Sequence, residues 1–170
     1  MTHRSGYAAW QDSFRWRVPT AFNIAAGILE RHDANRLALI DARDDAATRE
    51  YGYGELDVLS NRLANVLFAR GIALEDRVAI LMPQRAEVAI AHFAIFKTAA
   101  VAVPLHAGFG AEALRFRLKD AGVRFVVADH AGAEKVTALR DGLPELEAIF
   151  DVDGAAFARE LAEAATWCAH

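Results

Sequence analysis

Short apolar runs alternate with amphipathic stretches through the chain after residue 76, and this alternation constrains the fold more than any other feature. In order, the pattern predicts strand 77–82, helix 87–99, strand 101–105, helix 111–121, strand 125–129, helix 133–142, strand 146–152 and helix 155–165. Strands that alternate with helices pair in parallel through right-handed crossovers. We therefore predict an α/β fold with three layers, in which helices flank a mostly parallel sheet.

The residues before this alternation divide into an arm and a hairpin. Residues 1–35 are irregular and rich in aromatic side chains, with one short helix expected over 23–32. Two extended runs, 37–42 and 48–53, are joined by a polar segment and predict a β-hairpin. We accordingly divide the chain into an N-terminal arm, 1–35, and an α/β domain, 36–170.

A helix is predicted between the hairpin and the alternating segment. Leucines fall at helical spacing from residue 55 to residue 70, and Gly71 then ends the helix. Gly52 and Glu55 have the spacing of a capping box, but glycine stands where serine or threonine would supply the hydroxyl. We therefore expect a cap whose residues are correctly spaced but which lacks the side-chain hydrogen bond of a serine or threonine.

Charge and hydropathy argue against two classes of partner. The net charge is −4, and lysines and arginines form no runs that could follow a phosphate backbone, so nucleic acid is not an expected partner. Residues 88–111 are long and apolar enough to suggest a membrane span. However, Pro104, Gly108 and Gly110 indicate a helix followed by a buried strand, so no transmembrane segment is predicted. The lack of an apolar leader at the N-terminus and the single cysteine, Cys168, favour the cytoplasm.

Groups that could perform catalysis are sparse. The six histidines are scattered without the paired spacing of metal ligands, so no metal site is predicted. Cys168 has no evident base beside it in the sequence. The acidic pairs Asp44-Asp45 and Asp151/Asp153 are interpreted as polar turn residues. The sequence therefore assigns no catalytic residue.

One motif supports an alternative function. Gly108, Gly110 and Ala113 fit the dinucleotide fingerprint G-x-G-x-x-G/A between a strand and a helix, and Asp129 ends the next strand about 20 residues on. Glu112 argues against this hypothesis, because its carboxylate would repel the pyrophosphate that the helix N-terminus attracts. A dinucleotide-binding domain is the weaker hypothesis.

Several blocks, taken in order, resemble one enzyme family. They are Tyr53-Gly54-Glu55-Leu56 and the segments 60–64, 76–83 and 96–105. This series resembles the AMP-forming acyl-CoA synthetases of the adenylate-forming, AMP-binding family. Segments 109–114 and 117–122, and Phe14-Arg15-Trp16 ahead of Phe22-Asn23, are similar to its short-chain and medium-chain branch. The resemblance covers nearly the whole chain.

Two positions depart from the family pattern. Gly52 replaces the usual threonine or serine, and Thr98-Ala99-Ala100 lacks the glycine that commonly follows Lys97. These departures put local stability in question more than identity.

The resemblance implies a fold and an activity. The chain would be part of the large N-terminal domain of the adenylate-forming fold. The complete enzyme would use ATP and Mg²⁺ to convert a small carboxylic acid to its acyl-adenylate, then transfer the acyl group to coenzyme A. The family's phosphate loop, ribose-binding aspartate and mobile-domain lysine do not occur in these 170 residues. We therefore expect this chain to be an inactive N-terminal fragment that binds none of these cofactors tightly and exposes apolar surface prone to self-association.

The resemblance also implies a coenzyme A contact. In acetyl-CoA synthetase relatives, the loop after the proline-containing strand approaches the nucleotide end of coenzyme A, and the matching residues are His106, Ala107 and Gly108. Lys135 could meet the phosphates. The alternatives are an ordinary loop and a solvated lysine. A naturally short, noncatalytic binding or regulatory module also remains an open alternative for the chain.

Overall fold

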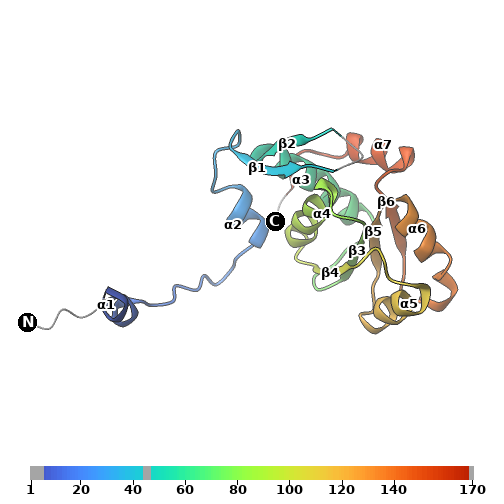
Figure 1. Cartoon of the computed structure of the whole chain (residues 1–170), viewed down its shortest axis with the longest axis horizontal. Helices are drawn as coiled ribbons and strands as arrows, with labels where there is room; N and C mark the ends of the chain where they lie inside the picture. The colour runs from blue at the N-terminus through green and yellow to red at the C-terminus, as the bar shows by residue number, and fades with distance from the viewer. Residues whose placement is uncertain (1–5, 44–46, 169–170) are drawn as a thin grey trace, which may run out of the picture.

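A parallel four-stranded sheet forms the centre of the molecule in a computed structural model that describes residues 6–43 and 47–168. Its strands are β3 (Arg77–Leu81), β4 (Val101–Leu105), β5 (Phe125–Ala128) and β6 (Ala148–Asp151), in the order β4-β3-β5-β6 (Figure 1). β3 is central, and its Val78 is paired with Ala102 on one side and Phe125 on the other. The predicted parallel sheet is confirmed.

Helices cover both faces of this sheet. On one face lie α3 (Tyr53–Ala69), α4 (Ala86–Lys97) and α7 (Ala155–Glu163), and on the other lie α5 (Ala111–Asp120) and α6 (His130–Thr137). Side chains of β5 alternate between the two layers: Phe125 and Val127 join one core, and Val126 and Ala128 join the other. A strand buried on both faces must be apolar throughout, which explains its unbroken apolar run. The three-layer prediction is confirmed.

A smaller antiparallel sheet precedes this unit. β1 (Leu37–Asp41) pairs with β2 (Arg49–Gly52), so the predicted hairpin is confirmed, while its tip at 44–46 lies outside the described residues. The hairpin and α2 (Ile24–Leu29) pack against α3 and α4 through a separate apolar cluster that contains Leu29, Tyr51 and Leu56. α2 is shorter than the predicted helix 23–32, because Asn23 is its N-cap and Glu30 its C-cap.

The predicted helix 133–142 is wrong at both ends. α6 begins at His130, because the Asp129 side chain caps the helix by accepting a hydrogen bond from the Gly132 N–H at 2.8 Å. A side chain at Gly132 would place its Cβ 2.5 Å from the Leu81 carbonyl oxygen, so glycine permits the close approach of α6 to β3. α6 ends at Thr137, and a separate 3₁₀ turn, η1, spans Arg140–Gly142.

Three helices end in the same hydrogen-bond pattern. After α3, α4 and α5, the backbone turns left-handed at Gly71 (φ 80°), Ala99 (φ 55°) and Gly122 (φ 57°). After α4, the Ala99 N–H donates to the Phe96 oxygen and the Ala100 N–H to the Ile95 oxygen, which is the Schellman arrangement. Alanine therefore occupies a backbone conformation that the other two helices give to glycine.

The N-terminal arm contains a helix that the sequence analysis missed. α1 (Gly6–Ser13) buries none of its residues and lies well away from the sheet (Figure 1). The helix has only eight residues, too few to show a repeated apolar spacing, and none of them packs on a core. Trp10 and Phe14 have ring centroids 5.1 Å apart, and Phe14 and Trp16 5.0 Å, so the aromatic side chains contact each other.

A buried polar cluster joins α3, α4 and the C-terminal segment. Lys97 Nζ donates to Asp57 Oδ1 and Asn61 Oδ1, each at 2.6 Å, and its side chain is fully buried. Asn61 Nδ2 in turn donates to the Thr166 carbonyl oxygen at 2.9 Å, and Asn65 Nδ2 donates at the same distance to the carbonyl oxygens on either side of it. These asparagines clamp the backbone of residues 165–167 onto α3.

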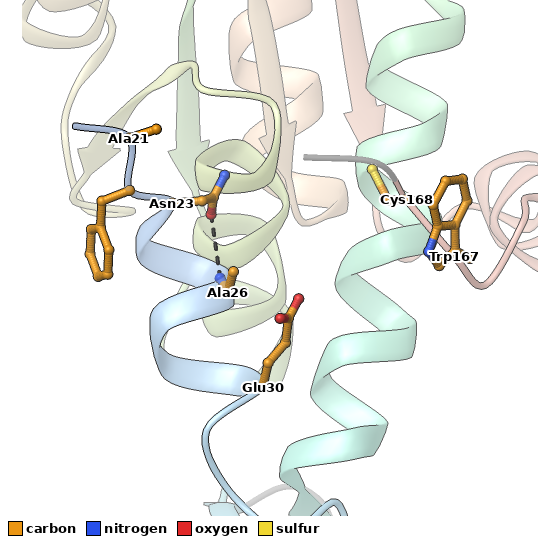
Figure 2. Close-up of a pocket in the computed structure, with 7 residues that line it drawn as sticks. Ala21, Asn23, Ala26, Glu30, Trp167 and Cys168 are labelled. Carbon is orange, nitrogen blue, oxygen red and sulfur yellow. Dashed lines mark hydrogen bonds between the residues drawn. The ribbon is translucent and has the colours of Figure 1, made fainter. Parts of the chain in front are cut away.

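The clamped segment borders an open groove. Figure 2 shows Trp167 and Cys168 beside α3, with α2 on the opposite side. The groove has a volume of about 700 Å³, and its α2 side includes Asn23, Ala26 and Glu30.

Within the described residues, no helix is both long and apolar enough to span a membrane.

Candidate functional site

The connections of the sheet create a crevice at the carboxyl ends of β3 and β5. From β3, α4 carries the chain over one face to β4, and from β5, α6 carries it over the other face to β6 in the opposite direction. Ligands of open α/β sheets bind where the connections diverge in this way. A cleft of about 690 Å³ lies there, and it is lined by Ala42, Arg43, Pro83, Gln84, Arg85, Asp129 and Asp153.

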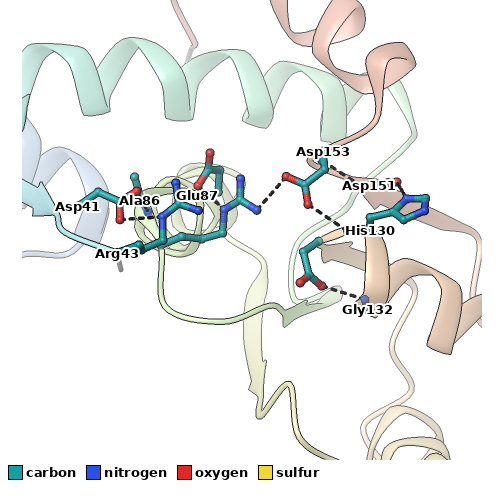
Figure 3. Close-up of polar contacts among 10 residues, drawn as sticks. Asp41, Arg43, Ala86, Glu87, His130, Gly132, Asp151 and Asp153 are labelled. Atoms are coloured by element: carbon teal, nitrogen blue, oxygen red, sulfur yellow. Dashed lines mark hydrogen bonds and ion pairs between the residues drawn. The ribbon is translucent and has the colours of Figure 1, made fainter. Parts of the chain in front are cut away.

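Arg85 is the central cation of this crevice, and it is already paired. Its Nε donates to Glu87 Oε2 at 2.7 Å and its Nη1 donates to Asp153 Oδ1 at 2.8 Å (Figure 3). The hydrogen bond to Glu87 raises the pKa of the guanidinium above its usual range. Burial is the largest single influence on Asp153 and opposes its ionisation, but the hydrogen bonds and charges of Arg85 and His130 together outweigh it and hold the pKa of this carboxyl below its ordinary value.

His130 extends the network to a second aspartate. Its backbone N–H donates to Asp153 Oδ2 at 3.2 Å, and its Nδ1 lies 2.7 Å from Asp151 Oδ2 (Figure 3). The hydrogen bond to Asp151 raises the pKa of the exposed His130 imidazole. Asp41 adds a bond from the hairpin, because its Oδ2 accepts the Ala86 N–H at the start of α4 at 3.3 Å. Together these groups brace the ends of β1, β3, β5 and β6.

The four residues expected at a coenzyme A contact come together at the same edge of the sheet. Lys135 Nζ on α6 donates to the Ala107 carbonyl oxygen at 2.8 Å, and the Gly108 N–H donates to His106 Nδ1 at 3.0 Å. Lys135 is exposed, and an ammonium has three donors, so two protons remain available to a ligand. The lysine is thus fixed to the loop after β4.

The dinucleotide alternative does not fit this geometry. Its glycines follow β4, which is the edge strand, whereas the crevice lies between β3 and β5. The carboxylate of Asp129 would have to contact a ribose, but it caps α6 through the Gly132 N–H. The positions of Gly108, Gly110 and Ala113 therefore argue against a dinucleotide site.

Sequence analysis missed the Arg85–Asp153–His130 network and interpreted Asp151 and Asp153 as turn residues. A usable signal was present, because His130 and Asp153 directly follow predicted strands, Asp151 lies at the end of one, and Arg85 comes three residues after another. In the described parts of the chain, no three histidine, cysteine or acidic side chains gather in a way that could hold a metal ion.

The three-layer unit is that of the N-terminal domain of adenylate-forming enzymes. The solved anthranilate CoA ligase AuaEII, in complex with anthranoyl-AMP, superposes with a TM-score of 0.80 and 26% identity over 89% of this chain and 29% of that one. The Mycobacterium tuberculosis fatty acyl CoA synthetase gives a TM-score of 0.65 and 33% identity over 70% of this chain and 24% of that one.

The chain belongs to the AMP-binding enzyme family, which matches residues 28–169. It is 35% identical over 129 residues to the acetyl-coenzyme A synthetase of Magnetococcus marinus, covering 76% of this chain and 20% of that protein. The acetyl-coenzyme A synthetase of Escherichia coli K12 is 34% identical over 132 residues, which are 75% of this chain and 20% of that protein. The chain therefore spans about a fifth of the length of these curated relatives.

Proposed function

We propose that this chain forms part of an AMP-forming acyl-CoA synthetase. The whole enzyme converts a small carboxylic acid and ATP to an acyl-adenylate and pyrophosphate, and then transfers the acyl group to the thiol of coenzyme A with release of AMP. The family match over residues 28–169 is the observation that carries this proposal. Identity to acetyl-coenzyme A synthetases supports a small acid as the substrate.

The described residues contribute scaffold and one contact rather than the adenylation centre. Charge that develops on the phosphates must be stabilised by Mg²⁺, backbone N–H groups and lysine. The family's phosphate loop does not occur in this sequence, and the charge of Arg85 is already paired with Glu87 and Asp153. ATP and Mg²⁺ would therefore be bound mainly by residues outside these 170, and the chain alone would be inactive. A cytoplasmic location is favoured for the whole enzyme, because the cytoplasm supplies the ATP and coenzyme A that it would consume.

The nucleotide end of coenzyme A would contact the loop 106–108 and Lys135. The hydrogen bond from Lys135 to Ala107 supports this, because it holds an exposed ammonium at the rim of the loop. Ammonium groups bind phosphates as point charges. Lys135 would orient a phosphate of coenzyme A, with the Gly108 side of the loop against the nucleotide.

The test of the activity measures acetate-dependent ATP–pyrophosphate exchange by the full gene product and, separately, by the 170-residue chain. We expect exchange only from a product that includes a phosphate loop. A full gene product of 170 residues that binds coenzyme A without exchange would replace the proposal with a noncatalytic binding module.

The test of the coenzyme A contact titrates coenzyme A into two variants of the full gene product. Lys135→Ala removes the proposed contact, and Lys119→Ala, the control, removes an exposed lysine of α5. We expect Lys135→Ala to bind coenzyme A about tenfold more weakly than Lys119→Ala, as for loss of one charge-assisted contact. Equal affinity of both variants would remove Lys135 from the site.

A further inference from the structure

A third cavity, of about 280 Å³, lies between β2, α3, α4 and α7. It is lined by Arg49, Tyr51, Leu59, Arg62, Leu63, Glu87, Ile90, Val127, Val152, Phe157, Ala158, Leu161 and Ala162. Most of these side chains are hydrocarbon. Val127 is buried at 1% exposure and marks the floor, while Ala158 and Ala162 are exposed on α7 and mark the mouth. The cavity is apolar inside and opens to solvent beside α7.

Arg62 lines this cavity and carries an unpartnered polar atom. Its Nε is buried and has no hydrogen-bond partner, and it is the only such side-chain nitrogen or oxygen found in the described residues. Buried polar atoms are nearly always bonded, so each exception needs an explanation. The nitrogen is closed to solvent in this conformation, so a ligand in the cavity would satisfy it by drawing the guanidinium toward itself.

The other charged groups of the cavity wall are already paired. Glu87 accepts from Arg85 at 2.7 Å, and Arg49 donates to Glu55 at 2.5 Å. Arg62 forms no ion pair with any described residue. One positive charge is therefore left without a counterion, which fits a monoanion better than a dianionic phosphate.

We propose that this cavity binds a monocarboxylate with a short hydrocarbon chain. The carboxylate would accept from the Arg62 guanidinium, and the chain would lie against Leu59, Leu63 and Phe157. Cavities of about 150 Å³ hold benzene, and sites for drug-sized ligands start at about 300 Å³. A cavity of 280 Å³ therefore suits a chain longer than that of acetate.

The test titrates octanoate, kept below its micelle concentration, into the full 170-residue chain by calorimetry. We expect saturable binding of one molecule, about tenfold tighter than octanol or octylamine, because only octanoate pairs with a cationic donor. Octanol that binds as tightly as octanoate would overturn the proposal, as would an absence of saturable octanoate binding.

Two matched pairs of variants locate the binding. Arg62→Gln should weaken octanoate binding about tenfold, and Arg159→Gln, which alters an exposed arginine of α7, should leave it unchanged. Ala158→Trp fills the mouth and should abolish binding, whereas Ala156→Trp, exposed but outside the lining, should not. If Arg62→Gln does not fold, the tryptophan pair decides. Octanoate affinity that survives Ala158→Trp would place the ligand elsewhere and overturn the assignment.

Discussion

Lys97 Nζ lies 2.6 Å from Asp57 Oδ1, and the lysine side chain is completely shielded from solvent. The same nitrogen reaches the Asp57 carbonyl oxygen at 3.1 Å and Asn61 Oδ1 at 2.6 Å. All three ammonium protons therefore have acceptors, which is what a buried charge requires. Lys97 joins α4 to α3 in the interior of the molecule.

Lys97→Met should destabilise the chain by about 2–4 kcal/mol, because it leaves the buried Asn61 oxygen without its donor and Asp57 without its counterion. Asp57 is 32% exposed and regains some hydration, which keeps the loss below the upper end for fully buried pairs. Urea denaturation measures the effect. Lys119→Met, at an exposed position on α5, is the control, and equal stability of the two variants would contradict a bridging role for Lys97.

Ala99→Gly should stabilise the chain by about 1 kcal/mol, because alanine at φ 55° bears a steric cost that glycine avoids. Gly71 and Gly122 already make the same turn without this cost. The control is Ala138→Gly, at an exposed right-handed position with φ −65°, where glycine should destabilise. Thermal unfolding of both variants measures the difference, and a lower melting temperature for Ala99→Gly would refute the argument.

Asp76→Asn should cost about 1–3 kcal/mol at pH 7, because Asp76 accepts both from Arg124 and from the Ala73 N–H. The hydrogen bond from Arg124 lowers the pKa of Asp76 below its ordinary value of 3.8. A depressed carboxyl pKa stabilises the folded state above pH 3.8, and this stability is lost as the pH falls below 3.8 through the folded-state pKa.

Urea titrations from pH 7 to pH 2.5 check this dependence. Asp76→Asn should show a shallower loss of stability in acid than the unchanged chain, while Asp120→Asn, at an exposed position on α5, should follow the unchanged chain. An acid limb that is the same for all three proteins would remove Asp76 from the acid response.

Self-association should depend on the aromatic arm. Trp10 and Trp16 are 59% and 82% exposed, and aromatic side chains contribute strongly to association. Sedimentation should show an average mass that rises with concentration. Trp10→Ser with Trp16→Ser should weaken association about tenfold or more, whereas Trp167→Ser, at a position outside the arm, should not. A strict monomer at high concentration would contradict the prediction.

The layers were predicted well from the sequence, because a strand that is buried on both faces is apolar along its whole length. Val126 and Val127 point to opposite cores and both are apolar, so β5 was recognisable. The start of α6 was missed because Asp129 both follows the strand and caps the helix. The sequence analysis assigned Asp129 to the strand alone. α1 was missed because no apolar face of it meets a core.

The candidate site was predicted less completely. Lys135 and Ala107 are 28 positions apart, and family resemblance rather than periodicity led us to expect both at the coenzyme A contact, although the hydrogen bond between them was not predicted. The pairing of Arg85 with Asp153 spans 68 positions, and nothing in the local sequence of either residue identifies its partner. The Arg62 cavity has no sequence signal, because it depends on what the packing of α7 against α3 leaves unfilled.

The clamp made by Asn61 and Asn65 has a consequence for how the protein is made. The bond from Asn61 to Thr166 joins residues 105 positions apart, so a ribosome has completed α3 long before the segment that it holds exists. Until that segment emerges, the face of α3 that receives it stays open to water and to chaperones. The unit that leaves the ribosome reaches its final form only after residue 167 has been added.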